Sequence, residues 1–87
     1  MLRTAAIELG PHGIRVNGLG PGPTATPMAK GMLDVPEYAQ ELIARTPLRR
    51  VGQTYLVAQA ALNVLRSEWI TGQIVMADGG SSLMTAH

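Results

Sequence analysis

The chain has 87 residues, of which 46% are hydrophobic and 15% are charged, and its formal net charge at pH 7 is +1. This composition is too apolar for a disordered chain, and the weak charge and scarce aromatic residues argue against a nucleic-acid surface. Cysteine is absent, which excludes disulfides, thiol catalysis and cysteine-ligated metal.

Signals for metal binding, membrane insertion and secretion are missing as well. The two histidines stand far apart, without a carboxylate cluster at ligand spacing, so we expect no metal site. The uninterrupted apolar runs are far shorter than a membrane span, and the N-terminal segment lacks a signal-peptide core. We therefore expect a cytoplasmic protein that contacts no membrane.

The N-terminal half is expected to form a helix, a strand and a loop. Apolar residues at helical spacing predict a helix over residues 2–9, which ends where Gly10 takes a left-handed cap and Pro11 cannot continue it. The chain thus opens inside a helix with no cap before it, which a natural domain seldom does. A short apolar run bounded by turn residues predicts a strand over 14–19, and a proline-rich loop follows over 21–27.

The C-terminal half is expected to form two helices and a second strand. Asp34 begins a capping-box pattern ahead of a helix that ends at Thr46, before a proline. Thr54 is in position to cap the next helix, whose apolar residues share one face. Residues 73–77 show no polar alternation after the glutamine, which is typical of a strand buried on both faces of a parallel sheet.

The order of these elements predicts an α/β fold. A long, mainly helical segment separates the two strands, and crossovers of this kind join parallel strands. Two strands are few for such a sheet, so we expect that neighbouring strands are missing from this chain.

The stretch 20-GPGPTAT-26 lies at the carboxyl end of the first predicted strand. In open α/β sheets, ligands bind beyond this end of the strands. Glycines let a ligand approach the backbone closely, prolines stiffen the loop, and threonine hydroxyls can bond an amide or a phosphate. A rigid strand-to-helix connection explains the same residues, and the glycine spacing is not that of the dinucleotide fingerprint.

A series of short motifs resembles the short-chain dehydrogenase/reductase family. The motifs stand in the family's order and at nearly its spacing, and they cover almost the whole chain. In sequence order they are 13-GIRVN-17, 21-PG-22 with Thr26, 46-TPL-48, 50-RVG-52, 70-ITGQ-73 and 78-DGG-80. The resemblance implies the C-terminal part of a Rossmann-type doubly wound parallel sheet, an NAD or NADP cofactor, and an alcohol/ketone pair as substrate.

The resemblance also implies roles for the proline-glycine loop. Pro21 and Gly22 would pack near the nicotinamide ring, and the backbone of Thr24 would meet the carboxamide. The hydroxyl of Thr26 would bond to the carboxamide or to the pyrophosphate. Asn17 is expected to be a structural hydrogen-bonding residue instead of a ligand contact.

Two further segments match parts of the family's architecture. Residues 27–46 correspond to the variable lid over the substrate, and residues 78–80 to a region near subunit contacts, so the resemblance implies a homo-oligomer. Either an apolar pocket wall or ordinary helix packing would explain four side chains of the lid segment. These are Met28, Met32, Leu33 and Tyr38.

The chain lacks the catalytic residues that the family uses. In the family, a tyrosine exchanges a proton with the substrate oxygen, and a lysine four positions later lowers the tyrosine pKa and holds the ribose. Neither Tyr38 nor Tyr55 has a lysine at that spacing, and Lys30 is the single lysine. The glycine-rich turn that binds pyrophosphate is also absent. We therefore expect residues 1–87 to be a C-terminal fragment of the family's domain that is inactive alone, and both tyrosines to be helix residues at an interface or a core edge.

Two functions from different classes stay open at this point. In the first, the chain is the C-terminal segment of an NAD(P)-dependent oxidoreductase and supplies the nicotinamide-side loop, the lid and part of the oligomer surface. In the alternative, it is a truncated, non-catalytic chain whose unpaired strands bind a partner or a related subunit.

Overall fold

The structure is a computed structural model that describes residues 1–22, 24–25 and 29–84. Its elements follow one another in the order that the sequence predicts, with three additional short helical segments. In chain order they are α1 (Leu2–Leu9), the 3₁₀ turn η1 (Gly10–His12), β1 (Gly18–Pro21), α2 (Lys30–Leu33), α3 (Pro36–Ala44), α4 (Thr54–Arg66), β2 (Ile74–Ala77) and α5 (Ser81–Met84).

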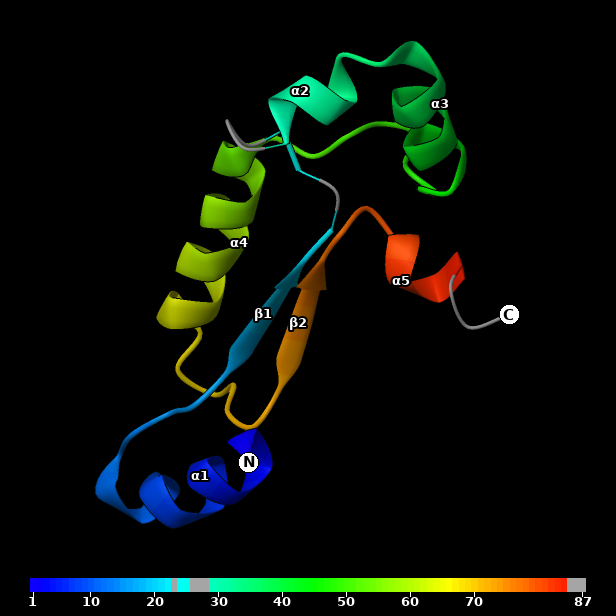
Figure 1. Ribbon diagram of the computed structural model, residues 1–87. Coiled ribbons are helices and arrows are strands. Elements are labelled where there is room, and N and C mark those ends of the chain that lie inside the picture. The colour runs from blue at the N-terminus through cyan, green and yellow to red at the C-terminus, as the bar shows by residue number, and fades with distance from the viewer. Residues whose placement is uncertain (23, 26–28, 85–87) are drawn as a thin grey trace.

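The two strands pair in parallel, which confirms the predicted α/β fold. Their register runs from Gly18 opposite Ile74 to Pro21 opposite Ala77. The crossover between them contains α2, α3 and α4, and α4 packs against both strands (Figure 1). The segment predicted to be a lid, residues 27–46, contains α2 and α3, which lie beyond the carboxyl ends of the strands (Figure 1). No helix among the described residues is long and apolar enough to cross a membrane.

The hydrophobic core within this chain is thin. Ala6 is the one buried hydrophobic residue among those that the structure describes. The strand predicted over 73–77 begins at Ile74, and the prediction that it is buried on both faces is wrong for this chain. Ile74 is 64% exposed and Met76 is 49% exposed. Two paired strands present one face that the described helices leave open, so apolar side chains on that face stay in contact with water.

The N-terminal turn differs in detail from the sequence prediction. Gly10 has φ −55° and continues the helical path into η1, so it is not the left-handed residue. Gly13 takes that conformation instead, with φ 76°. The first strand was expected over 14–19 but begins at Gly18, because the preceding backbone bonds to the loop ahead of β2 and not to a strand.

The starts of two helices also differ from expectation. Asp34 ends α2 and does not open α3, which begins at Pro36 after Val35. A proline at the first helical position has a φ that already suits a helix and lacks an N–H that would go unbonded, so it displaces the capping box. Thr54 is the first residue of α4, one position past the cap, and Gln53 precedes it without a side-chain cap bond.

Candidate functional site

The loop after β1 is held against the end of β2 at Gly22. Its N–H donates a long hydrogen bond to the carbonyl of Ala77, at 3.4 Å. A Cβ built on Gly22 would lie 2.6 Å from the Cβ of Asp78 and 2.8 Å from its Cα. Backbone cannot yield as the end of a side chain can, so only glycine fits at this close approach. This contact agrees with a rigid strand-to-helix connection, one of the two explanations that the sequence left open, and its partner is the end of the neighbouring strand.

Thr24 is the next described residue of this loop after Gly22. Its hydroxyl donates a hydrogen bond to the carbonyl of Gly22 at 2.8 Å, and it forms a parallel bridge with Gly52. Ala25 N–H donates to the Gly52 carbonyl at 2.8 Å. Among the described residues, the backbone N–H of Thr24 has no hydrogen-bond acceptor.

The other predicted loop residues fall in two groups. Pro21 closes β1 opposite Ala77 and is exposed. Thr26, for which the resemblance implies a hydroxyl contact to the cofactor, lies outside the described residues.

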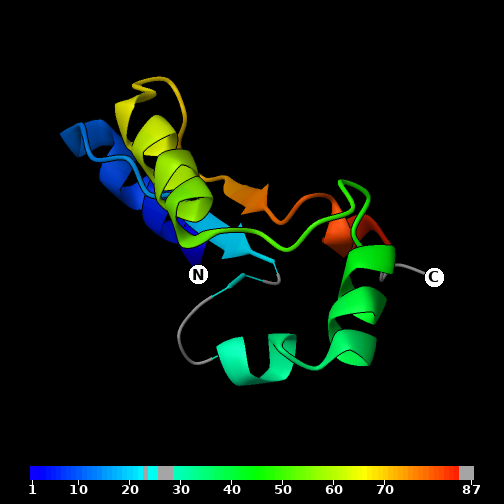
Figure 2. The same ribbon diagram turned by 90° about the horizontal axis from the view of Figure 1, so that it is seen from above.

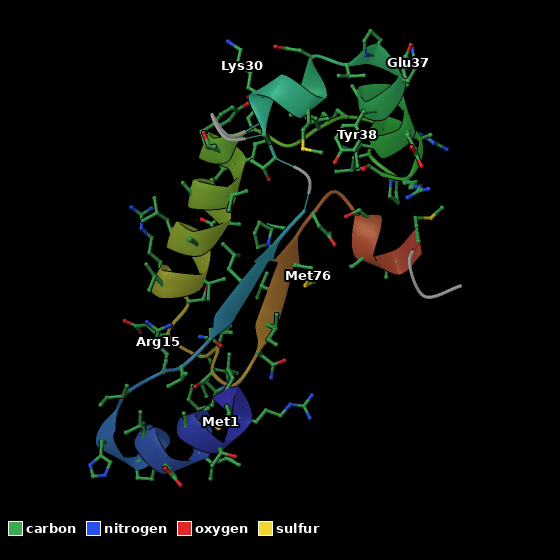
Figure 3. All side chains as sticks on the ribbon, in the orientation of Figure 1. Met1, Arg15, Lys30, Glu37, Tyr38 and Met76 are labelled. Carbon is green, nitrogen blue, oxygen red and sulfur yellow. The ribbon has the colours of Figure 1, made fainter. Side chains whose placement is uncertain are left out.

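A cavity of about 180 Å³ joins the loop to the lid segment. It places Thr24 beside three of the four lid side chains singled out in the sequence, Met32, Leu33 and Tyr38. Figure 3 labels Tyr38 on α3. The fourth, Met28, lies outside the described residues. Ala29 and Leu42 are the other described residues that line it. Leu42 stands four positions after Tyr38, and this helical spacing is the sequence signal that could have identified it.

A second hollow, of about 530 Å³, lies beside the end of β2 and was not foreseen from the sequence. Leu56 of α4 and Met76 of β2 contribute apolar surface, and among the described residues of the lining Arg50 is the one with a basic side chain. Residues 77–80 form another part of its wall.

Asp78 fixes the turn that follows β2. One carboxylate oxygen accepts the N–H of Gly80 at 2.9 Å, and the other accepts the N–H of Ser82 at 2.9 Å. A hydrogen bond from the Ser82 side chain, followed by these backbone N–H groups, lowers the pKa of Asp78 below its ordinary value of 3.8, since all of them favour the charged form. The ionised carboxylate therefore caps α5 and holds residues 78–80 in one geometry.

The 13-GIRVN-17 motif joins the elements at the opposite end of the strands. The guanidinium of Arg15 donates to three carbonyls at the end of α4, those of Val64, Leu65 and Ser67, at 3.1, 2.6 and 2.9 Å (Figure 3). The carbonyls of Val64 and Ser67 also accept backbone N–H groups, those of Ser67 and Ile70. A cation at the end of a helix adds further hydrogen bonds there and complements the helix dipole.

Asn17 has the structural role that the sequence predicts. Its amide nitrogen donates to the carbonyl of Ile70 at 2.9 Å, and its amide oxygen accepts the N–H of Gln73 at 3.1 Å. Gly72 N–H donates to the carbonyl of Val16 at 2.8 Å. The motif 70-ITGQ-73 is thus bonded to 13-GIRVN-17, and neither faces the loop at the carboxyl end.

Comparison with known proteins connects this arrangement to a family. The sequence model of the family described as "Enoyl-(Acyl carrier protein) reductase" matches residues 1–82. The chain belongs to the short-chain dehydrogenase/reductase family. A 7alpha-hydroxysteroid dehydrogenase of Escherichia coli (strain K12) is 39% identical over 82 residues, which cover 92% of this chain and 32% of the relative.

Solved structures of short-chain dehydrogenases/reductases share the fold. A short-chain type dehydrogenase/reductase from Mycobacterium ulcerans superposes with a TM-score of 0.88 at 33% identity, covering 94% of this chain and 30% of that one. A gluconate 5-dehydrogenase from Burkholderia cenocepacia J2315, in complex with NADP and tartrate, gives a TM-score of 0.83 at 28% identity over 94% and 33% of the two chains. The present chain therefore spans about a third of the length of these relatives.

Among the described residues of this short-chain dehydrogenase/reductase, the two tyrosines lie on different helices. Tyr38 is on α3 at the cavity, and Tyr55 is on α4 and 66% exposed. Lys30 is an exposed residue of α2. No group of three or more histidine, aspartate or glutamate side chains in this part of the chain is placed to hold a metal ion.

Proposed function

We propose that residues 1–87 are the C-terminal part of an NAD(P)-dependent short-chain oxidoreductase that interconverts an alcohol and a ketone. In this proposal they supply the nicotinamide-side loop, the substrate lid over residues 27–46, and part of a homo-oligomer surface. Two observations support it. The relatives, which are about three times as long as this chain, are named as dehydrogenases and reductases. The face of β2 that bears Ile74 and Met76 is not covered by the described residues of this chain.

The geometry at Gly22 and Thr24 is the observation that carries the proposal. A nicotinamide is a flat ring with a carboxamide, and when bound it supplies or accepts a hydride. A flat ring needs backbone that can be approached closely, and its carboxamide oxygen needs a donor. Gly22 carries no side chain that could cover the loop, Asp78 fixes its backbone beside the strand ends, and the Thr24 N–H has no acceptor among the described residues. Pro21 and Gly22 would lie at the ring, Thr24 N–H at the carboxamide, and the Thr26 hydroxyl at the carboxamide or pyrophosphate.

The substrate would occupy the space between this loop and the lid. The cavity there is lined mainly by carbon, from Met32, Leu33 and Leu42, with the Tyr38 ring at its edge. Such a lining suits the hydrocarbon part of an alcohol or ketone better than an ionised substrate. Relatives named for cyclopentanol and for a steroid are in keeping with that class.

The proposal is tested on the intact protein. Binding of NAD⁺ and NADP⁺ is measured by titration, and turnover of cyclic ketones with NADH and NADPH is followed by the absorbance of the reduced nicotinamide. We expect one cofactor to bind and at least one ketone of the panel to be reduced. Absence of binding by both cofactors would contradict the proposal. The 87 residues alone are expected to give no turnover, because no tyrosine in them is followed four positions later by a lysine.

The alternative of a non-catalytic partner-binding chain is not favoured by the comparisons. The relatives reported above are named as enzymes, and the match to them extends over nearly the whole chain.

A further inference from the structure

The end of α3 is joined to the turn after β2 through Thr46. This residue is 3% exposed and is the one buried polar residue among those that the structure describes. Its hydroxyl donates to the carbonyl of Leu42 at 2.8 Å, so the hydroxyl is satisfied within α3. Its methyl group faces the turn, where a Cβ built on Gly79 would lie 2.9 Å from Thr46 Cγ2.

Backbone contacts join the same two segments. Leu48 N–H donates to the carbonyl of Gly79 at 3.1 Å. A Cβ built on Gly80 would lie 2.8 Å from Pro47 Cγ. Gly79 and Gly80 have φ values of 62° and 91°, which place both in the region that glycine tolerates best. Both ribbon views show the end of α3 beside the segment that leads into α5 (Figure 1, Figure 2).

The two walls of the cavity, the loop with Thr24 and helix α3, are therefore both held against the same turn, residues 78–80. On one side, Gly22 of the loop packs against Asp78. On the other side, α3 carries Tyr38 and Leu42, and Thr46 connects its end to Gly79. A displacement of Thr46 away from Gly79 would move the lid wall while the loop wall stayed on Asp78.

We propose that the contact between Thr46 and Gly79 is a specificity-determining joint that sets the distance between the lid and the Thr24 loop. Thr46 and Gly79 are positioning residues in this proposal, since they touch neither cofactor nor substrate and act through α3. The inference rests on the proposed function only where it concerns substrate; the joint itself is a property of the fold.

Gly79→Ala is the variant that opens the joint. The added methyl would overlap Thr46 Cγ2, and the φ of 62° adds backbone strain. Thr46→Ser removes Cγ2 but keeps the hydroxyl that bonds to Leu42, so it should relieve the overlap in the double variant.

Gly80→Ala is the matched control, because its methyl would meet Pro47 and Thr46→Ser cannot relieve that contact. Gly13→Ala tests the backbone strain of a positive φ without steric overlap, since φ is 76° at Gly13 and an added Cβ would meet nothing within 4 Å.

The first measurement is hydrogen exchange of the α3 amides in the intact protein. We expect Gly79→Ala to speed amide exchange in residues 37–44 by about tenfold or more, and Thr46→Ser to reverse most of this change. Gly80→Ala should not be rescued by Thr46→Ser, and Gly13→Ala should leave α3 exchange unchanged. Unaltered α3 exchange in Gly79→Ala, or no rescue by Thr46→Ser, would contradict the proposal that the contact between Thr46 and Gly79 positions α3.

The second measurement uses the bulkiest ketone that the wild-type protein reduces. We expect Gly79→Ala to change its KM by about fivefold with kcat within about twofold, and Thr46→Ser to restore the KM. If α3 exchange responds as expected but KM does not, the joint holds α3 and the assignment of α3 as a substrate wall is wrong. If kcat falls and KM is constant, the role in specificity is overturned as well. A wild-type protein that reduces no ketone would contradict the proposed function alone, because the exchange result stands without it.

Discussion

The ends of the strands and their faces are stabilised in different ways in this chain. At the ends, single side chains bond to specific backbone groups: Arg15 to carbonyls at the end of α4, and Asp78 to the amides of the following turn. On the face of β2, Ile74 and Met76 lie open to water. The turns at the ends of the strands are held by hydrogen bonds made within the chain, whereas apolar surface on the face of β2 is not buried within it. Directional contacts can be local, but a hydrophobic core needs volume that a short chain cannot supply.

Truncation of Ile74 is expected to have the largest effect on the free energy of unfolding. If the remainder of an oxidoreductase covers the face of β2, Ile74→Ala in the intact protein should lower the free energy of unfolding by about 3 kcal/mol, as for a core residue. Ile74→Val serves as the graded control and should lower it by about 1 kcal/mol. Urea denaturation measures both. Values near zero for both variants would show that this face stays exposed in the intact protein.

Removing the guanidinium of Arg15 tests the hydrogen-bonded ends. Arg15→Ala deletes three charge-assisted bonds to the end of α4. Because the group is half-buried, we expect a loss of about 2 kcal/mol in the free energy of unfolding. Arg3→Ala, in which an exposed arginine of α1 is removed, should change it by less than about 0.5 kcal/mol. Equal urea midpoints for the two variants would contradict the role assigned to Arg15.

Thr26→Ala tests the cofactor assignment of the loop. Loss of one hydrogen-bond partner should weaken binding of the preferred cofactor by about 1–2 kcal/mol while the stability of the protein without cofactor stays the same. Isothermal titration measures the affinity. Thr4→Ala on the exposed side of α1 is the control and should bind as the unaltered protein does. An unchanged affinity in Thr26→Ala would remove Thr26 from the cofactor site.

The smallest effect expected is a dependence on pH from Asp78. Its pKa is lower in the folded chain than the ordinary value of 3.8, so its contribution to stability is complete above that value and is lost as the pH falls below it toward the folded pKa. The urea midpoint, followed from about pH 5 to about pH 3, should fall less steeply in Asp78→Asn than in the unaltered protein. Asp34→Asn, which changes the net charge equally at an exposed position, is the control. Identical slopes in all three proteins would show that the Asp78 cap contributes nothing.

Prediction from the sequence was most successful where periodicity or local chemistry decides the structure. The helix over 2–9 and the second strand, within one residue of 73–77, lie where the apolar pattern places them. The structural role of Asn17 was also predicted. Predictions at the ends of elements were less successful: Gly13 takes the left-handed conformation in place of Gly10, and Val35 and Gln53 precede α3 and α4 without a side-chain cap bond.

The apolar pattern of the sequence placed the first strand a few residues too early. Apolar residues occur over 14–19, yet the paired strand is Gly18–Pro21, a run with low intrinsic preference for strands. Its pairing depends on the register with Ile74–Ala77, and Gly18 and Gly20 make room for the side chains of Ile74 and Met76. A residue that is chosen for the space it leaves to a distant neighbour gives no signal of its own in a short window of sequence.

The element types and the α/β class follow from the sequence alone, because they depend on patterns of residues that are close together in the chain. Only the tertiary structure showed that Thr24 shares a cavity with Tyr38 and Leu42, and that Thr46 closes against Gly79. These pairs are brought together by the crossover between two parallel strands. Contacts of that kind depend on the path of the whole segment, since no local pattern records which distant residue will fill a given space.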